Sequence, residues 1–392
     1  MSSPPPPHSS RDTALVFVAK TVRTFCYGFL GVLLPIHLSN LGMSTMGVGL
    51  SVTLTLVGSA VLTYGIRRPV ERYGSRVTLL GLAALSLVAA VLMLTSHNPW
   101  LVVLAAMIGN VAVGTGETGP FLSIEQVLIA RATPFEKRTS VLSYYNFIGY
   151  AAAAAGSAIL GLGPTAGLLF GIFLAGSVVQ LVVFRMLPVQ HIEAKTRSGG
   201  LIPKSPTIRK IAGLFSIDSF GGGFITQSLV AYYFHERFGL TLATLGVVFF
   251  ASQVLSAISL LLAPLLARRI GLLNTMVSTH LVSNVFLIAI AFSPLPWLAI
   301  ALYLGRQLLS QMDVPTRQAY LMAIVEDDER EEAAISTTLA RTVTQAVSPS
   351  IAGWVMSTAA LSAPFVFGGV IKSIYDVAIW QVFRKVPLRE SG

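Results

Sequence analysis

The sequence GETGPFLSIEQ, residues 116–126, places two carboxylates, Glu117 and Glu125, inside an apolar region that runs from about Trp100 to Ala130. A helix of about 20 apolar residues crosses the hydrocarbon core of a bilayer, so this region is long enough to span it. A charge at that depth is penalised by about 2.5–3.5 kcal/mol, and an ionisable side chain there indicates a functional site. We therefore expect this stretch to carry part of the site, with most of the remaining chain serving as its scaffold.

The second half of the chain contains a counterpart, QMDVPTRQ, residues 311–318, in the apolar region 295–325. Each stretch has a Pro within its apolar region and a charged residue directly followed by Gln. Two intramembrane charged sites in repeated positions predict a site assembled from both halves of the chain.

Composition assigns the chain to the membrane proteins. Hydrophobic residues make up 54% and charged residues only 11% of the 392 residues, and the mean hydropathy is +0.73. A soluble domain carries about 25% charged residues. Twelve apolar stretches are long enough to be transmembrane helices, and they lie at about 14–37, 45–66, 76–95, 99–130, 140–161, 165–187, 209–234, 241–266, 271–293, 295–324, 333–357 and 361–383.

Several chemistries lack their sequence signals. The single cysteine, Cys26, cannot form an internal disulfide, and the histidines have no paired spacing, so we expect no metal site. No phosphate-binding loop, catalytic triad or nucleophile elbow is present, which argues against ATP use, other cofactors and an enzyme. We expect the short Pro- and Ser-rich segment 1–13 to be a disordered tail.

Basic residues define the predicted topology. Of the 27 Lys and Arg residues, 20 lie in the tails and loops of one side, and the opposite loops contain only Arg237. Because basic loops remain in the cytoplasm, both termini and the central loop are predicted to be cytoplasmic. The net charge of +10 therefore reflects topology, and we expect no nucleic-acid partner.

The two halves resemble each other weakly. Glu125-Gln126 matches Arg317-Gln318 at an offset of 192 residues, and FCYGF, residues 25–29, matches FGGGF, residues 220–224, at an offset of 195. Gly42 and Gly74 match Gly239 and Gly271 at an offset of 197. A parallel repeat of six spans with a cytoplasmic linker resembles the layout of the major facilitator superfamily.

The segment RRPVERYGSR, residues 67–76, resembles the superfamily's loop motif Gly-x-x-x-Asp-Arg-x-Gly-x-Arg, although Arg67 replaces its first Gly and Glu71 replaces its Asp. The resemblance implies a cytoplasmic gate made by Glu71, Arg72, Gly74 and Arg76. The segments DSFGGGF, residues 218–224, and DVPTRQ, residues 313–318, also resemble a bacterial branch of small-molecule transporters without an assigned substrate.

This resemblance implies an all-α fold of twelve transmembrane helices in two six-helix bundles. It implies a multi-pass protein of the bacterial inner (plasma) membrane that works as a monomer by alternating access. The expected parts are the tail 1–13, an N-terminal bundle 14–187, a cytoplasmic linker 188–208, a C-terminal bundle 209–384 and a tail 385–392.

In this family spans 1, 4, 7 and 10 line a central cavity, and the charged residues inside spans concentrate there. Proton coupling is predicted for four carboxylates, Glu117, Glu125, Asp218 and Asp313. Substrate binding is predicted for Arg23, Tyr27, Gln126, Arg306, Arg317, Arg341 and Gln345. Because the repeat aligns Arg23 with Asp218 and Glu125 with Arg317, we expect neutralising pairs across the interface between the halves.

Structural roles compete with these assignments. Asp313 and Arg317 are spaced i,i+4 and can neutralise each other, and Lys372 and Asp376 are expected to form a purely structural pair of the same spacing. Glu125 is alternatively a gate residue that pairs with a basic side chain. Glu117 has no basic neighbour within one turn, so it is the favoured proton carrier, because a carboxyl removed from water favours its protonated form.

The predicted function is secondary transport of a small molecule, as efflux coupled to inward proton movement. The arginines inside the spans favour an alternative, a uniporter or importer of an organic anion. A membrane receptor of the same fold that binds its ligand without transport is the remaining alternative.

Overall fold

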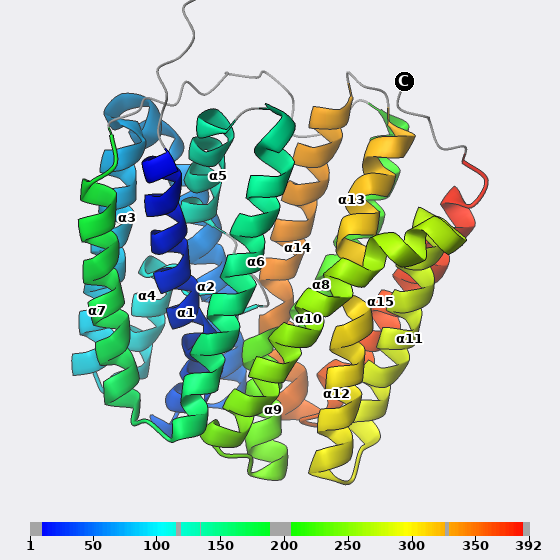
Figure 1. Cartoon of the computed structure of the whole chain (residues 1–392). Helices are drawn as coiled ribbons and strands as arrows, with labels where there is room; N and C mark the ends of the chain where they lie inside the picture. The colour runs from blue at the N-terminus through cyan, green and yellow to red at the C-terminus, as the bar shows by residue number, and fades with distance from the viewer. Residues whose placement is uncertain (1–9, 115–118, 134, 189–204, 326–328, 387–392) are drawn as a thin grey trace, which may run out of the picture. The chain divides into compact units, whose positions relative to one another are not determined.

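The computed structural model describes residues 10–114, 119–133, 135–188, 205–325 and 329–386 (Figure 1). In these residues every regular element is a helix. The predicted linker 188–208 and the predicted tails 1–13 and 385–392 lie largely outside the described residues. The first described helix begins at Ser10, and the helix after the linker begins at Pro206, so both start a few residues before the expected positions.

The first six predicted spans correspond to seven α-helices and one short 3-10 helix. Their bounds are α1 (Ser10–Asn40), α2 (Thr45–Gly65), α3 (Arg67–Thr95), α4 (Pro99–Ile108), α5 (Pro120–Ala132), α6 (Phe135–Ile159), η1 (Leu160–Leu162) and α7 (Ala166–Arg185). The last six correspond to α8 (Pro206–Gly223), α9 (Gln227–Phe238), α10 (Leu242–Ile270), α11 (Leu272–Phe292), α12 (Pro296–Ser310), α13 (Asp313–Ile324), α14 (Arg330–Thr358) and α15 (Ala363–Phe383).

Three predicted spans, the fourth, seventh and tenth, are each divided into two helices. In the fourth span α4 ends before Asn110, whose φ is 50°, and α5 begins with Pro120 in its first turn. In the seventh, Gly223 ends α8, and the Thr226 hydroxyl caps α9 by accepting from the Leu229 amide. In the tenth, the break falls at residues 311–312, directly before Asp313. Asp313 thus begins α13 directly after its break, whereas Asp218 and Glu125 lie inside α8 and α5, away from the breaks.

Helix α10 illustrates how polarity is distributed. Val254, Ile258, Leu261 and Leu265 form an exposed apolar stripe, whereas Ser252, Ser256 and Ser259 are buried. A soluble protein has the opposite arrangement, because its exposed faces are polar. Among the described residues, eight helices are long and apolar enough to cross a membrane.

The chain forms two compact units. The N-terminal unit comprises Met1–Met43, Leu54–Lys195 and Thr241–Phe250, and the C-terminal unit comprises Ser44–Thr53, Thr196–Leu240 and Ala251–Gly392. In the N-terminal unit α1 packs against α6 and α7, with Phe121, Tyr145 and Phe184 in the core. In the C-terminal unit α8 packs against α14 and α15, with Phe215, Tyr320 and Tyr375 in the core.

Candidate substrate and proton-coupling site

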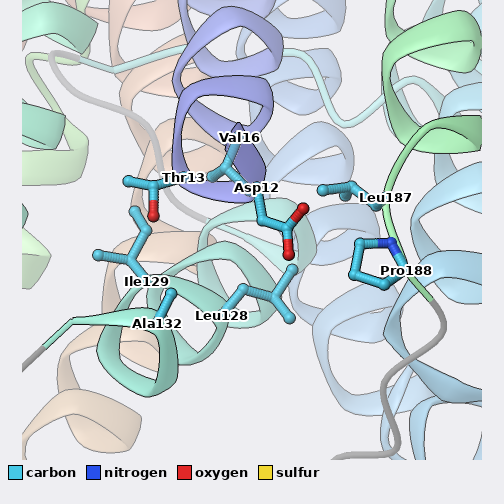
Figure 2. A pocket seen from close by; sticks show the side chains of 8 residues that line it. All are labelled: Asp12, Thr13, Val16, Leu128, Ile129, Ala132, Leu187 and Pro188. Atoms are coloured by element: carbon cyan, nitrogen blue, oxygen red, sulfur yellow. The ribbon is translucent and has the colours of Figure 1, made fainter. Parts of the chain in front are cut away.

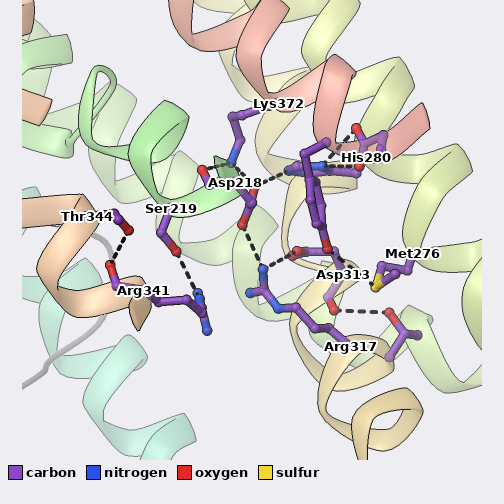
Figure 3. A network of polar contacts seen from close by, with 12 residues as sticks. Asp218, Ser219, Met276, His280, Asp313, Arg317, Arg341, Thr344 and Lys372 are labelled. Atoms are coloured by element: carbon purple, nitrogen blue, oxygen red, sulfur yellow. Dashed lines mark hydrogen bonds and ion pairs between the residues drawn. The ribbon is translucent and has the colours of Figure 1, made fainter. Parts of the chain in front are cut away.

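Asp218 on α8 is the centre of a buried charge network in the C-terminal unit (Figure 3). One of its oxygens lies 2.5 Å from the Lys372 ammonium nitrogen, and the other lies 2.7 Å from Nη1 of Arg317. All three side chains are less than 10% exposed. One carboxylate therefore holds two cations from two other helices, α13 and α15.

Arg317 also pairs within its own helix. Its Nη1 lies 3.1 Å from Oδ2 of Asp313, one turn earlier on α13. The predicted i,i+4 pair between Asp313 and Arg317 is therefore present, and Arg317 bridges two aspartates from different helices. Pro315 is tolerated between them because the first turn of a helix leaves its backbone N–H groups unbonded.

Sequence reasoning missed His280, which lies on α11 between two carboxylates. Its Nδ1 lies 2.8 Å and 3.0 Å from the two oxygens of Asp376, and its Nε2 lies 3.7 Å from Asp218 Oδ1. The Asn284 amide donates to Asp376 at 2.8 Å. The one available signal was a His inside an apolar span, at helical spacing from Asn284.

The expected pair between Lys372 and Asp376 is wrong. Lys372 Nζ instead donates to Asp218, and Asp376 accepts from Asn284 and is bonded to His280. Both side chains have closer partners on neighbouring helices than on their own, so the i,i+4 spacing did not decide the pairing.

Arg341 and Arg306, both predicted substrate residues, have different surroundings. Arg341 Nε on α14 donates to the Ser219 hydroxyl at 3.0 Å. Arg306 Nη1 on α12 donates to Gln307 Oε1 at 2.8 Å. Gln345, one turn after Arg341, is half-buried.

The N-terminal unit contains a second buried ion pair. Arg23 on α1 donates to both oxygens of Glu125 on α5, at 2.9 Å and 2.7 Å, and the Tyr145 hydroxyl donates to the same carboxylate. The Arg23 guanidinium also lies 4.4 Å from the centre of the Phe121 ring. With Arg23 at 1% and Glu125 at 0% exposure, both charges are buried, and Arg23 is the basic partner of Glu125.

Neutralising pairs between the halves were expected for these charges, and that expectation is wrong. Arg23 pairs with Glu125 inside the N-terminal unit, and Asp218 pairs with Arg317 inside the C-terminal unit. The repeat identified equivalent positions correctly, but each pair closes within its own unit.

The other predicted site residues lie in several places. The Tyr27 hydroxyl donates to the Gly109 carbonyl at 3.3 Å, which links α1 to the end of α4. Gln126 on α5 is half-buried. Glu117, the favoured proton carrier, lies outside the described residues.

The predicted gate motif is helical, where a loop was expected. Glu71 and Arg72 are exposed on the first turns of α3, and Arg76 is half-buried. Gly74 interrupts the helix with φ 84° and ψ 168°.

The N-terminal unit also contains a pocket. It is lined by the start of α1, the end of α5 and the segment after α7 (Figure 2): Asp12, Thr13, Val16, Leu128, Ile129, Ala132, Leu187 and Pro188. None of the predicted site residues that the structure describes lines it, so it is not the candidate site.

The profile of the Major Facilitator Superfamily matches residues 16–310, well over half of the chain. The chain belongs to the major facilitator superfamily. It is a multi-pass membrane protein and a secondary transporter of a small molecule, and it is not an enzyme.

Individual proteins are similar to this chain over nearly its whole length. An uncharacterised membrane protein of Saccharomyces cerevisiae is 23% identical over 432 aligned residues, which cover 97% of this chain and 96% of the yeast protein. The crystal structure of the nucleoside transporter NupG is similar with a TM-score of 0.76 at 12% identity, covering 95% of this chain and 99% of that chain.

The crystal structure of a D-xylose–proton symporter gives a TM-score of 0.68 at 12% identity and covers 95% of this chain and 97% of that chain. At such identities the likeness shows the fold alone. The predicted fold class, the all-α major facilitator fold of twelve transmembrane helices in two bundles, is confirmed.

Proposed function

We propose that this superfamily member exports a small molecule in exchange for inward-moving protons. The observation that supports proton coupling is the shared carboxylate of Asp218, which lies 2.5 Å from Lys372 and 2.7 Å from Arg317. A buried carboxylate holds two cations only while it is ionised. Protonation would therefore release both cations at once.

Release of these cations has a mechanical consequence. Asp218 lies on α8, Arg317 on α13 and Lys372 on α15, so neutralisation of one group loosens three helices of the C-terminal unit. A proton that binds one conformation better than another shifts the equilibrium between them, and coupling requires this difference. Asp313 shares Arg317 with Asp218 and is proposed as a second coupling residue.

The roles of Glu117 and Glu125 in coupling stay proposals from the sequence. Glu125 is already bonded to Arg23 and Tyr145, so its protonation would break a comparable pair in the N-terminal unit. The location in a bacterial inner membrane, the cytoplasmic termini and the monomeric state are proposed on the basic loops and the sequence resemblance alone.

The test begins with a thermal-shift screen of the purified protein at acidic and alkaline pH, because a compound that binds only the folded state raises its stability. A stabilising compound is then followed in proteoliposomes with an imposed pH gradient. We expect Asp218→Asn to abolish gradient-driven accumulation while counterflow exchange of the compound continues.

The matched control is Glu236→Gln, which neutralises an exposed carboxylate at the end of α9 and should leave accumulation intact. Asp313→Asn and Glu117→Gln complete the series. Full pH-driven accumulation in all three neutralised variants would contradict proton coupling. Accumulation in the opposite direction would contradict efflux and leave coupling supported.

A further inference from the structure

The charges around Asp218 do not balance. Two carboxylates, Asp218 and Asp313, lie among four cationic side chains of the C-terminal unit: Arg306, Arg317, Arg341 and Lys372. Arg306 and Arg341 each interact electrostatically with both Asp218 and Asp313. The third carboxylate, Asp376, is bonded to His280 and Asn284.

The two aspartates are already occupied. Asp218 is bonded to Lys372 and Arg317, and Asp313 is paired with Arg317. Within the described part of the chain, neither Arg306 nor Arg341 forms an ion pair with a carboxylate. Arg306 and Arg341 are therefore the two guanidinium groups of this cluster that no described carboxylate neutralises in an ion pair.

Arg341 is held in place while most of its guanidinium stays available. Its Nε donates to Ser219 at 3.0 Å, on the residue that follows Asp218. Figure 3 shows its guanidinium beside Ser219, whereas Arg317 lies against the aspartates. Arg341 as a whole is half-buried, so its remaining N–H groups can reach a bound molecule.

Arg306 is positioned through Gln307. Its Nη1 donates to Gln307 Oε1 at 2.8 Å, and Gln307 itself donates to the Ser252 hydroxyl at 2.9 Å. Nε of Arg306 is buried and has no hydrogen-bond partner among the described residues. A buried donor without an acceptor is costly, and a buried charge without a counter-ion costs more.

We propose that Arg306 and Arg341 bind a negatively charged group of the transported molecule, a carboxylate or a phosphate. A guanidinium presents paired N–H donors that match the oxygens of either group. The anion supplies both the missing counter-charge and the missing acceptor. This inference names the substrate class for the transporter proposed above. Anion binding itself is argued from the two arginines, and only the direction of transport and its coupling to protons rest on the proposed function.

Equilibrium binding without any pH gradient tests the inference separately from proton coupling. The purified protein in nanodiscs is screened by thermal shift with succinate, benzoate, inorganic phosphate and glycerol 3-phosphate. The three organic probes are compared with analogues that lack the negative charge, succinamide, benzamide and glycerol, and choline serves as a cation. We expect stabilisation by members of the anionic set alone.

Affinity for the stabilising anion is then measured in Arg306→Gln and Arg341→Gln. Each charge-assisted hydrogen bond contributes enough that its loss should weaken binding about ten- to a hundredfold. Lys in place of either arginine keeps the charge but loses the paired donors, and should weaken binding less. Arg269→Gln removes an exposed arginine at the end of α10 and should change nothing.

Three results would overturn the inference: stabilisation by neutral or cationic compounds instead, no stabilisation by any anion, or unchanged anion affinity in both Gln variants. Should a Gln variant fail to fold, the Lys variant of the same residue decides, because it retains the charge. Anion binding that persists in a protein without pH-driven transport would support this inference and contradict the coupling proposal.

Discussion

Arg23 and Glu125 form a buried two-bond ion pair in the N-terminal unit, with the polarity opposite to that of its counterpart in the C-terminal unit. The repeat aligns Arg23 with Asp218 and Glu125 with Arg317, and Asp218 pairs with Arg317 at 2.7 Å. In both units the ion pair therefore joins the same two repeat positions, and the acidic and basic residues have exchanged places. The shared contact, rather than the sign of either charge, is the feature common to both halves.

Removal of one partner of the Arg23–Glu125 pair should destabilise the protein strongly. Breaking a buried pair leaves an uncompensated charge and costs about 3–5 kcal/mol. We expect Arg23→Gln and Glu125→Gln each to lower the apparent melting temperature in detergent, and the double variant to lose less than the sum of the two. Arg68→Gln, an exposed control, should have no effect. Strictly additive losses would show that the two side chains are not coupled.

The repeat was readable from the sequence because equivalent residues keep a constant offset. The same alignment could not reveal whether a charge meets its partner in its own unit or in the other one. Helical spacing has a similar limit. A continuous helix would place Arg306, Asp313 and Arg317 on one stripe, but the break at residues 311–312 puts Arg306 on a different helix, where it bonds to Gln307.

Gly74 and Gly271, which the repeat aligns, have the same unusual backbone conformation. Their φ and ψ angles are 84° and 168°, and 86° and 161°. This region is essentially restricted to glycine, and another residue there costs about 1–3 kcal/mol. We expect Gly74→Ala and Gly271→Ala each to lower thermal stability. Among the described residues, no atom beyond the immediate chain neighbours lies within 4 Å of a Cβ at Gly271, so crowding does not explain its loss.

Gly81 provides the matched control for these glycines. It lies inside α3, and in the part of the chain that the structure describes a Cβ there would also meet nothing within 4 Å outside its own helix backbone. Ala is the better helix former, so Gly81→Ala should leave stability unchanged or raise it by about 0.5–1 kcal/mol. Equal losses at Gly74 and Gly81 would contradict the backbone explanation.

The single buried cysteine allows a direct test of topology. In a Cys26→Ser background, Arg269→Cys marks a predicted cytoplasmic loop and His97→Cys marks a loop of the opposite side, and both positions are exposed. An impermeant thiol reagent should label His97→Cys in intact cells and Arg269→Cys only after permeabilisation. The reverse pattern would place both termini outside the cytoplasm.

Lys372 should destabilise the protein when its partner Asp218 is neutralised. Asp218→Asn leaves Lys372 and Arg317 buried with one acid fewer, so we expect a lower melting temperature and reduced folded protein. Adding Lys372→Met removes one stranded charge and should restore part of the stability, because an apolar side chain of similar length replaces the cation. Size-exclusion yield and melting temperature report both effects. No rescue by the second substitution would mean that Lys372 does not depend on Asp218.

Contacts of His280 were beyond sequence reasoning, because Asp376 is 96 residues away and belongs to another helix. Burial supplies the reason for the contact: a carboxylate at 0% exposure requires donors, and α11 provides both His280 and Asn284. Apolar periodicity could predict that α11 is buried on one side. It could not predict which neighbour faces its polar residues.

Histidine NMR gives a specific test of this contact. In protein labelled with ¹⁵N-histidine, the signal lost in His280→Gln identifies His280 among the six histidines. We expect Asp376→Asn to move the Nδ1 resonance strongly, because that nitrogen lies 2.8 Å from a carboxylate oxygen. Asp218→Asn should act mainly on Nε2, which lies 3.7 Å from the other acid. His97→Gln, which removes an exposed imidazole, should leave the His280 signals in place. If Asp376→Asn leaves the Nδ1 resonance unchanged, His280 does not form the hydrogen bond to Asp376.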